Sequence, residues 1–213
     1  MGVQFQDTDK SLSQTLTDIA HSINTEQITL RQLFELVGEQ GLLLLCAFLT
    51  IPFLIPVSIP GVSTVFGAAI ILIAIGITLN RLPWVPNRLM SRPIATEKLI
   101  PTLDKGAQMV AKIERFIHPR MQMLTDGAAV NRLNGLALMF SGVLLMFPLG
   151  LIPFSNTLPG LAILFLAIGI LQRDGLFIIL GYLMMLLTII YFGALFVGAV
   201  LAGQGIMSLF GSG

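Results

Sequence analysis

Charged residues are missing from three long stretches of this 213-residue sequence. No Asp, Glu, Lys or Arg occurs in residues 41–80, 133–172 or 175–213, and charged residues make up only 11% of the chain. A soluble globular domain carries about 25% charged residues, so this composition excludes that class. With 55% apolar residues, the chain is predicted to be an all-α integral membrane protein.

Residues that carry out catalysis or bind metals are scarce. The one cysteine, Cys46, excludes an intramolecular disulfide, and the histidines, His21 and His118, show no metal-ligand spacing. No glycine-rich phosphate loop occurs, and Gly61-Val-Ser63 lacks the second glycine of a nucleophile elbow. We therefore expect no enzyme, no metal and no cofactor, and the net charge of +1 argues against nucleic-acid binding.

Residues 1–40 are polar and predict two amphipathic helices that pack on protein or lie on a membrane surface. No signal peptide is expected, because no basic start precedes an apolar stretch and a cleavage site. The first helix has apolar residues three or four positions apart: Leu12, Leu16, Ile19 and Ile23. The second begins at Thr29, which has capping-box spacing to Gln32, and ends at a break in residues 38–41.

Prolines interrupt the apolar tract 41–80 near its midpoint. The residues that break the helix are Pro52, Pro56, Pro60 and Gly61. The arm before these breaks has at most sixteen residues and spans about 24 Å, short of the roughly 30 Å hydrocarbon core of a bilayer. The tract is therefore predicted to form a re-entrant hairpin, whose freed backbone must be satisfied by protein or a wet cavity.

Residues 81–132 form a basic linker with nine Lys or Arg and four Asp or Glu. This excess predicts a cytoplasmic location by the positive-inside rule, with the N-terminus on the same side of the bacterial inner membrane. One amphipathic helix is predicted from Met109, Val110, Ile113, Phe116 and Ile117. The basic residues from Arg81 to Arg120 could bind anionic lipid head groups, although topogenic bias explains them equally well.

A second membrane hairpin, residues 133–175, repeats the layout of the first. The matched positions are Pro52 with Pro148, Pro56 with Pro153, Ser58 with Ser155, and Pro60-Gly61 with Pro159-Gly160. The sequence Ala-Ile-Gly-Ile also occurs at 74–77 and 167–170. These matches predict an internal duplication, and we favour parallel insertion of the two hairpins because the charged linker cannot cross the bilayer.

Polar residues at the two hairpin tips are the candidate solute or ion site. They are Ser58, Ser63 and Thr64 in the first hairpin and Ser155, Asn156 and Thr157 in the second. Broken helices in transporters bind ions or small polar solutes with such residues. Alternatively, these side chains cap helix ends and satisfy the freed backbone. The hairpins contain no carboxylate, which argues against an ion relay by side chains.

A tight elbow, Arg173-Asp174-Gly175, precedes the C-terminal segment 176–213. We expect a cytoplasmic turn with an ion pair and a positive anchor, with Gly175 able to take a left-handed conformation. Glu39 and Arg81 flank the first hairpin, and either could pair across to this elbow. Residues 176–201 predict a transmembrane helix that ends outside.

Small residues recur every four positions in this last helix, at Ala194, Gly198 and Ala202. Such a face allows close approach of another helix, although small residues in an apolar helix can also arise by chance. One crossing helix and two hairpins make a thin wall for a pathway. We therefore expect a homodimer.

Several short motifs occur in a fixed order along residues 11–203. They are Pro52-Phe-Leu-Ile-Pro56, Pro60-Gly61, Pro83-Trp-Val-Pro86, His118-Pro-Arg120, Ile152-Pro-Phe-Ser-Asn156, Leu158-Pro159, and Gly169 followed by Arg173-Asp-Gly175. In these motifs the chain resembles the bacterial exopolysaccharide synthesis ExoD family. It departs from the family pattern at Gly76, where glutamine is common, and at Gly160, where alanine is usual.

The resemblance implies an inner-membrane protein associated with exopolysaccharide production, a role that defines no molecular activity. Together with the broken hairpins, it predicts passage of an ion or small polar solute that supports exopolysaccharide synthesis or export. The alternative is a non-transporting membrane scaffold for polysaccharide-synthesis enzymes. Those enzymes would then be its partners.

Overall fold

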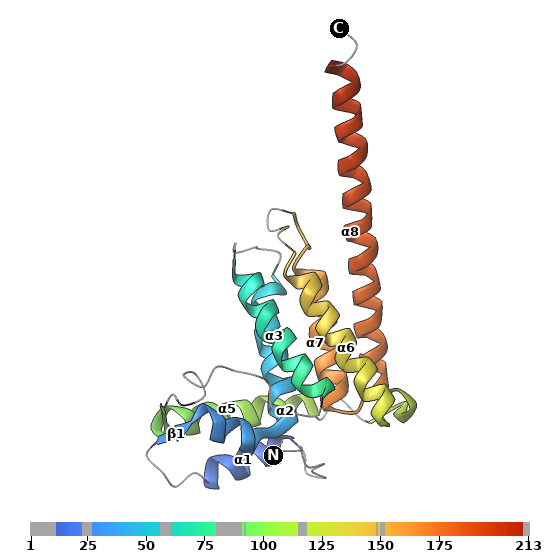
Figure 1. The fold of residues 1–213 in the computed structure, drawn as a ribbon. Coiled ribbons are helices and arrows are strands. Elements are labelled where there is room, and N and C mark those ends of the chain that lie inside the picture. Colours follow the sequence, from blue (N-terminus) through green and yellow to red (C-terminus); the bar gives the residue numbers. More distant parts are fainter. Residues whose placement is uncertain are drawn as a thin grey trace.

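The computed structural model is almost entirely helical (Figure 1). It describes residues 12–22, 27–55, 61–79, 91, 93–114, 119–147, 149 and 152–210. The helices are α1 Leu12–Ser22, α2 Leu30–Thr50, α3 Val62–Thr78, α5 Thr96–Glu114, α6 Ala128–Leu145, α7 Thr157–Leu171 and α8 Gly175–Phe210. Two 3₁₀ helices, η1 Ile51–Phe53 and η2 Gln122–Leu124, and two strands, β1 Gln27–Thr29 and β2 Pro93–Ala95, complete the described structure. Predictions made for Pro56, Ser58, Pro60, Arg81 and Pro148 lie outside the described residues.

Helices α2, α3, α6 and α7 form a bundle in which each helix packs on two others. The first hairpin contributes α2 and α3, and the second contributes α6 and α7. Between the hairpins, α3 packs on α6 and α2 packs on α7. The described parts of both hairpin turns lie at the same end of the bundle (Figure 1), while parallel insertion into a membrane stays a prediction. The duplication and the re-entry into a membrane stay predictions.

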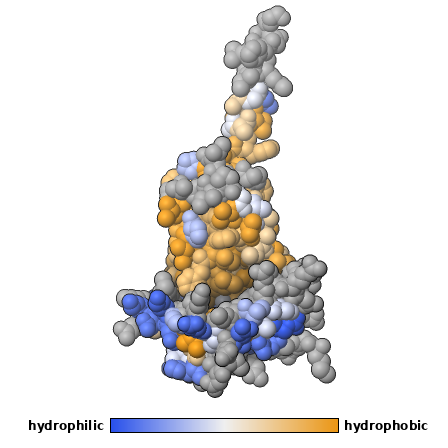
Figure 2. Space-filling view, turned by 90° about the vertical axis from the view of Figure 1, so that its left-hand side faces the viewer, coloured by the Kyte–Doolittle hydropathy of each residue, from blue (hydrophilic) through white to orange (hydrophobic). Residues whose placement is uncertain are grey.

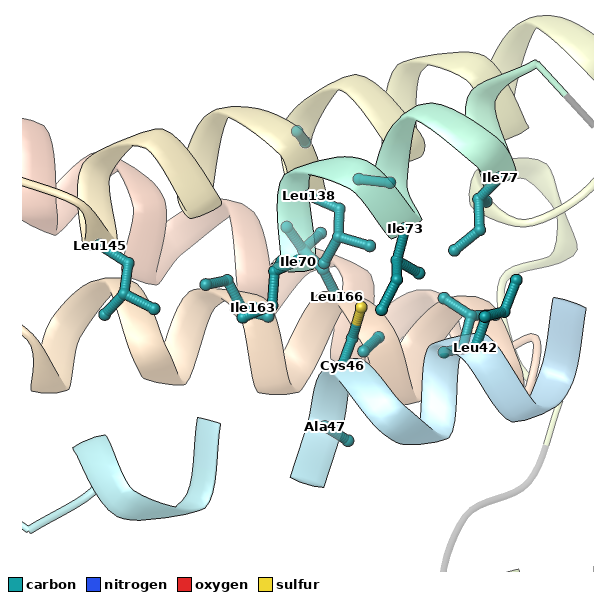
Figure 3. Close-up of a cluster of buried hydrophobic side chains, with 14 of the residues drawn as sticks. Leu42, Cys46, Ala47, Ile70, Ile73, Ile77, Leu138, Leu145, Ile163 and Leu166 are labelled. Carbon is teal, nitrogen blue, oxygen red and sulfur yellow. The ribbon is translucent and has the colours of Figure 1, made fainter. Parts of the chain in front are cut away.

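Apolar side chains from all four helices fill the interior of the bundle (Figure 3). The buried residues labelled there are Leu42, Cys46, Ala47, Ile70, Ile73, Ile77, Leu138, Leu145, Ile163 and Leu166. Burial of apolar area stabilises such a core by about 25 cal/mol per Å² in water. In lipid the same side chains contribute mainly through close packing.

Glycines set the closest approaches between helices. A Cβ atom on Gly67 of α3 would lie 2.5 Å from Met146 Cγ and 3.0 Å from the carbonyl oxygen of Gly142 in α6. Between α7 and α8, a Cβ on Gly169 would lie 2.8 Å from the backbone nitrogen of Ile178. These contacts exclude larger residues, as expected where helices pack through small residues.

The Gly38 joint divides α2 into two helical parts. The capping box predicted at its start is present, because the Thr29 hydroxyl accepts from the Gln32 backbone N–H while the Gln32 side chain accepts from Thr29 N–H. The break predicted in residues 38–41 is confirmed at Gly38, whose φ of 61° and ψ of −154° suit only glycine. The apolar part of α2 then continues to Thr50.

We call α1, α5, β1 and β2 the base layer. It lies across the end of the bundle opposite the hairpin turns (Figure 1). Helix α1 packs on α5, where Glu114 accepts hydrogen bonds from the backbone N–H and hydroxyl of Ser13. Strand β1 pairs antiparallel with β2, with Ile28 opposite Ile94. Figure 2 shows hydrophilic residues gathered at this base, beneath an apolar bundle surface.

Two described helices are long and apolar enough to cross a membrane by length and composition. They are Ala128–Leu145, in α6, and Gly175–Gln204, in α8. Sequence analysis predicted only the second. Helix α6 begins at Ala128, five residues before the charge-free tract 133–172, so that the exposed Arg132 lies within its N-terminal part. Helix α8 extends far beyond the bundle (Figure 1), and only 6% of its apolar window is buried.

The glycine contact between α3 and α6 predicts a measurable stability difference. Gly67→Val should lower the free energy of unfolding by about 1–3 kcal/mol, because its side chain must displace Met146 and the Gly142 backbone. Gly193→Val is the matched control, because a Cβ at that position of α8 meets nothing within 4 Å. Thermal unfolding in detergent measures both. Equal melting temperatures for the two variants would contradict the packing described here.

Candidate functional site at the hairpin turns

The turn of the second hairpin buries its polar residues. Ser155, Asn156 and Thr157 are all buried, and they lead directly into α7. The Ser155 hydroxyl lies 2.9 Å from the carbonyl oxygen of Leu149 and 2.8 Å from that of Ile152. Its proton therefore satisfies backbone carbonyls within the turn, as the capping alternative predicts for this residue.

Asn156 occupies the N-cap position of α7, but its side chain makes no capping hydrogen bond to the helix. The residue is only 5% exposed, so its amide lies inside the turn rather than in solvent. Its backbone carbonyl accepts from the Gly160 N–H at 3.0 Å. Helix capping thus explains the main chain of Asn156 but not the side chain.

Two of the first-hairpin candidates lie at the start of α3. Ser63 is buried and Thr64 is exposed, one and two residues after the first helical residue, Val62. Gly61 precedes them with a φ of 83°, a left-handed conformation that favours glycine. Among the described residues, no hydrogen bond joins Ser63 or Thr64 to the second turn.

The two hairpins meet where the end of α2 contacts the first turn of α7. A Cβ atom on Gly160 would lie 3.3 Å from Phe53 Cβ and 3.9 Å from the carbonyl oxygen of Thr50. Thr50 is fully buried, and its hydroxyl donates to the Ala47 carbonyl at 2.7 Å. Sequence reasoning missed Thr50, although it stands two residues before the first proline of the break.

We define the turn site as Thr50, Ser155, Asn156 and Thr157, four buried polar residues at the α2–α7 end of the bundle. Buried Pro159 and Gly160 keep the first turn of α7 against α2, whereas Pro52 and Pro153 are exposed. Helix α8 supports the second turn, because the Tyr191 hydroxyl donates to the Pro153 carbonyl at 2.7 Å. The turn site contains hydroxyl groups and one amide, without charge.

A shallow depression of about 480 Å³ lies on the outside of α3 and α6. Its lining is Ile71, Val143, Met146 and Phe147. All four side chains are apolar, so this surface suits an apolar neighbour and not a polar solute. The depression is apolar, whereas the turn site is lined by polar residues, so the two surfaces suit different ligands.

The elbow before α8 differs from its prediction. Arg173, with a φ of 50°, takes the left-handed conformation expected for Gly175. Gly175 is required for another reason, because a Cβ there would lie 2.9 Å from the Met121 carbonyl oxygen while its N–H donates to the Arg120 carbonyl at 2.8 Å. Asp174 is 1% exposed and accepts from the Leu176 N–H at 2.9 Å, so it caps α8.

The remaining elbow candidates are Arg173, Glu39 and Arg81. Arg173 is exposed, and Glu39 lies half-buried beside the Gly38 joint. Arg81 lies outside the described residues. Pairing of Glu39 or Arg81 with the second elbow stays a prediction.

A buried polar network near the base was missed by sequence reasoning. The Asn134 amide donates to the Leu124 carbonyl at 2.9 Å and its oxygen accepts from the Tyr182 hydroxyl at 3.0 Å. The network ties α6, α8 and η2 together. The sequence feature that could have indicated this network is Asn134, a polar residue at the start of a mainly apolar tract.

Metal binding finds no support in the described part of the chain. These residues bring together no group of three or more His, Cys, Asp or Glu side chains that could hold a metal ion. Cys46 lies in the apolar core, His21 is exposed on α1, and His118 lies outside the described residues. The absence of a metal and a cofactor stays a prediction.

Comparison with known proteins gives consistent matches over most of the chain. The family model described as "Exopolysaccharide synthesis, ExoD" matches residues 12–194. "Protein ExoD" of Rhizobium meliloti is 61% identical over 210 residues, which cover 99% of this chain and 88% of that protein. An uncharacterized protein of Synechocystis sp. is 27% identical over 174 residues, covering 78% of this chain and 81% of that protein. No solved structure matches.

The hydrogen bonds of Ser155 predict a structural role for its hydroxyl. Ser155→Ala should lower the free energy of unfolding by about 1 kcal/mol, because it removes the buried hydroxyl that donates to the Leu149 and Ile152 carbonyls, which then keep only their backbone N–H donors. Thr64→Ala is the matched control on the other hairpin turn, where the side chain is exposed. Its effect should stay within about 0.5 kcal/mol. Equal thermal stability of the two variants would contradict the assignment.

Proposed function

The chain belongs to the exopolysaccharide synthesis ExoD family, which implies involvement in exopolysaccharide synthesis, and we propose that it acts by passing an ion or small polar solute through the turn site. The protein would do so in the bacterial inner membrane, in support of exopolysaccharide synthesis or export. The observation that carries this proposal is the position of the buried polar turn along α8.

The Tyr191–Pro153 hydrogen bond places the second turn level with Tyr191. At 1.5 Å per residue, α8 rises about 23 Å from Leu176 to Tyr191 and about 15 Å more to Leu201. The sum of about 38 Å exceeds the roughly 30 Å hydrocarbon core, so a spanning α8 would be tilted. The turn site would then lie inside the membrane, short of its far boundary.

Polar groups at that depth need partners, because lipid offers no hydrogen bonds. The start of α3 and the start of α7 both lie at this end and have no side-chain cap. Their backbone N–H groups carry the positive end of each helix dipole. Together with the hydroxyls and amide of the turn site, they suit a small solute that is bound by dipoles rather than by charged side chains.

The filled core shapes how passage would occur. Below the turn site, the bundle interior contains the apolar cluster of Figure 3, whose described side chains would give a polar solute little to replace its lost hydrogen bonds. The turn site would therefore be reached from the side opposite the base layer, with the core as the barrier. Passage to the other side requires the hairpins to shift.

A scaffold for polysaccharide-synthesis enzymes is the second candidate, and the same filled core favours it, because a scaffold needs no internal path. Enzymes would dock on the base layer, where α5 exposes Lys105, Gln108 and Lys112. Positive-inside bias puts this layer and the N-terminus in the cytoplasm. The basic residues of 81–120 would then lie near anionic lipid head groups.

We also propose a homodimer. Ala194, Gly198 and Ala202 are exposed on α8, C-terminal to Tyr191, whose hydroxyl contacts the second turn. A second α8 could approach this face closely. Two copies side by side would also supply the additional protein wall that polar turns inside a membrane require.

Transport through the turn site predicts a selective loss on removal of one amide. Purified protein in liposomes should speed volume recovery after a challenge with potassium chloride, potassium phosphate or glycerol. Asn156→Ala should slow this flux about tenfold, since each 1.4 kcal/mol of lost binding is a factor of ten. Asn131→Ala, an exposed asparagine of α6, is the matched control and should match the wild type.

Two results would sink the transport proposal. One is recovery no faster than in empty liposomes for all three solutes, and the other is equal flux for wild type and Asn156→Ala. Copurification of a polysaccharide-synthesis enzyme that is lost in Lys105→Glu/Lys112→Glu would then favour the scaffold.

A further inference from the structure

Helix α5 packs mainly on α1 in the base layer, but one small part of it also contacts the bundle. Val110 is 2% exposed, and Ala107, one turn earlier, is also buried. The cluster that they form has Leu44 of α2, Leu171 of α7 and Leu103 of α5 itself packed against it. Leu44 and Leu171 come from different hairpins, so α5 bridges the hairpins at the end opposite the turn site.

Helix α5 is held near both of its ends. Strand β2 leads directly into its N-terminus and pairs with β1, which leads directly into α2. At the other end, Glu114 binds Ser13 at the start of α1. The contact made by Ala107 and Val110 lies between these anchors and consists of two small apolar side chains.

The Gly38 joint lies between the anchored and the bridged parts of α2. The residues of α2 before Gly38 continue directly from strand β1 of the base layer. Leu44 comes after Gly38 and lies in the bundle. A single non-helical glycine can change the angle between two helical parts by rotation about its own φ and ψ. Leu44 can therefore move relative to the base layer while the strand pair stays intact.

We propose that Ala107 and Val110 form a latch that closes the base end of the bundle by bridging α2 and α7, which also pack on each other directly. Release of the latch opens the core between the hairpins toward the base layer, and α2 moves about Gly38. This inference rests on the proposed function for its purpose, since a solute leaving the turn site must cross the core. The latch itself can be tested without any flux.

The native Cys46 is a reporter of latch opening. It is fully buried in the core on α2, half a turn beyond Leu44. The full-length protein in sealed membrane vesicles of each orientation is treated with a membrane-impermeant methanethiosulfonate cation, and the rate of Cys46 modification is measured. We expect slow modification of the wild type from both sides.

Val110→Ala should raise the rate about tenfold from the side of the base layer only, the change that corresponds to about 1.4 kcal/mol in an opening equilibrium. Gln108→Ala, on an exposed face of the same helix, is the matched control and should leave the rate unchanged. Val110→Asp is the stronger variant and should raise the rate further. Faster modification from both sides would indicate general loosening and would overturn the latch.

Flux and Cys46 modification separate the two proposals. Unchanged modification in both Val110 variants would overturn the latch, even if the wild type transports solute. A side-selective increase without any flux in the wild type would support the latch and contradict transport. Loss of the monodisperse peak in size-exclusion chromatography would show that a Val110 variant does not fold. If Val110→Asp fails in this way, the modification rate of Val110→Ala alone tests the latch.

Discussion

Close packing between helices of different hairpins holds the bundle together. Each arm of the first hairpin packs on an arm of the second, α3 on α6 and α2 on α7. The first pair approaches through Gly67 and Gly142, and the second through Gly160, which lies near the Thr50 carbonyl of α2 and Phe53 of η1. The first hairpin packs mainly on the second, which α8 supports in turn through α7, and the turn site takes residues from both hairpins.

This packing gives the protein two different ends. At one end, breaks at the prolines free backbone groups, and buried hydroxyls and an amide gather there. At the other end, the polar base layer covers the bundle, and the Asn134–Tyr182 network ties α6 to α8. The apolar core lies between. A role in moving a solute and a role in holding partners make opposite demands on this core, since the first needs it to open and the second does not.

Local signals in the sequence predicted the features that local chemistry determines. Helical periodicity predicted α1 and α2, the Thr29–Gln32 spacing predicted the capping box, and the 38–41 break is confirmed at Gly38. Buried polar residues at the second turn were also predicted as a candidate site, although whether they bind a solute stays a prediction. Helix-breaking and helix-capping residues act over a few neighbouring positions, so these features could be predicted from the sequence alone.

Contacts between distant segments were beyond such signals. Three-residue strands such as β1 and β2 carry too little pattern, and their pairing depends on how α1 and α5 pack. The Asn134–Tyr182 bond joins residues 48 positions apart. The sequence predicted that Gly175 is a glycine because of its turn conformation. In the structure, a glycine is needed there because Met121, from another segment, lies too close for a side chain. Thr50 became part of the site only because α2 ends against α7.

The depth of the second turn in a bilayer is the most direct test of the central claim, that both hairpins end inside the membrane. A spin label at Phe154, an exposed residue of that turn, would be compared with labels at Leu201 and Lys105 in a Cys46→Ala background in liposomes. We predict that the Phe154 label is accessible to oxygen, shielded from a water-soluble nickel complex, and deeper than the Leu201 label. Nickel accessibility at Phe154 equal to that at Lys105 would put the turn in water and contradict the account.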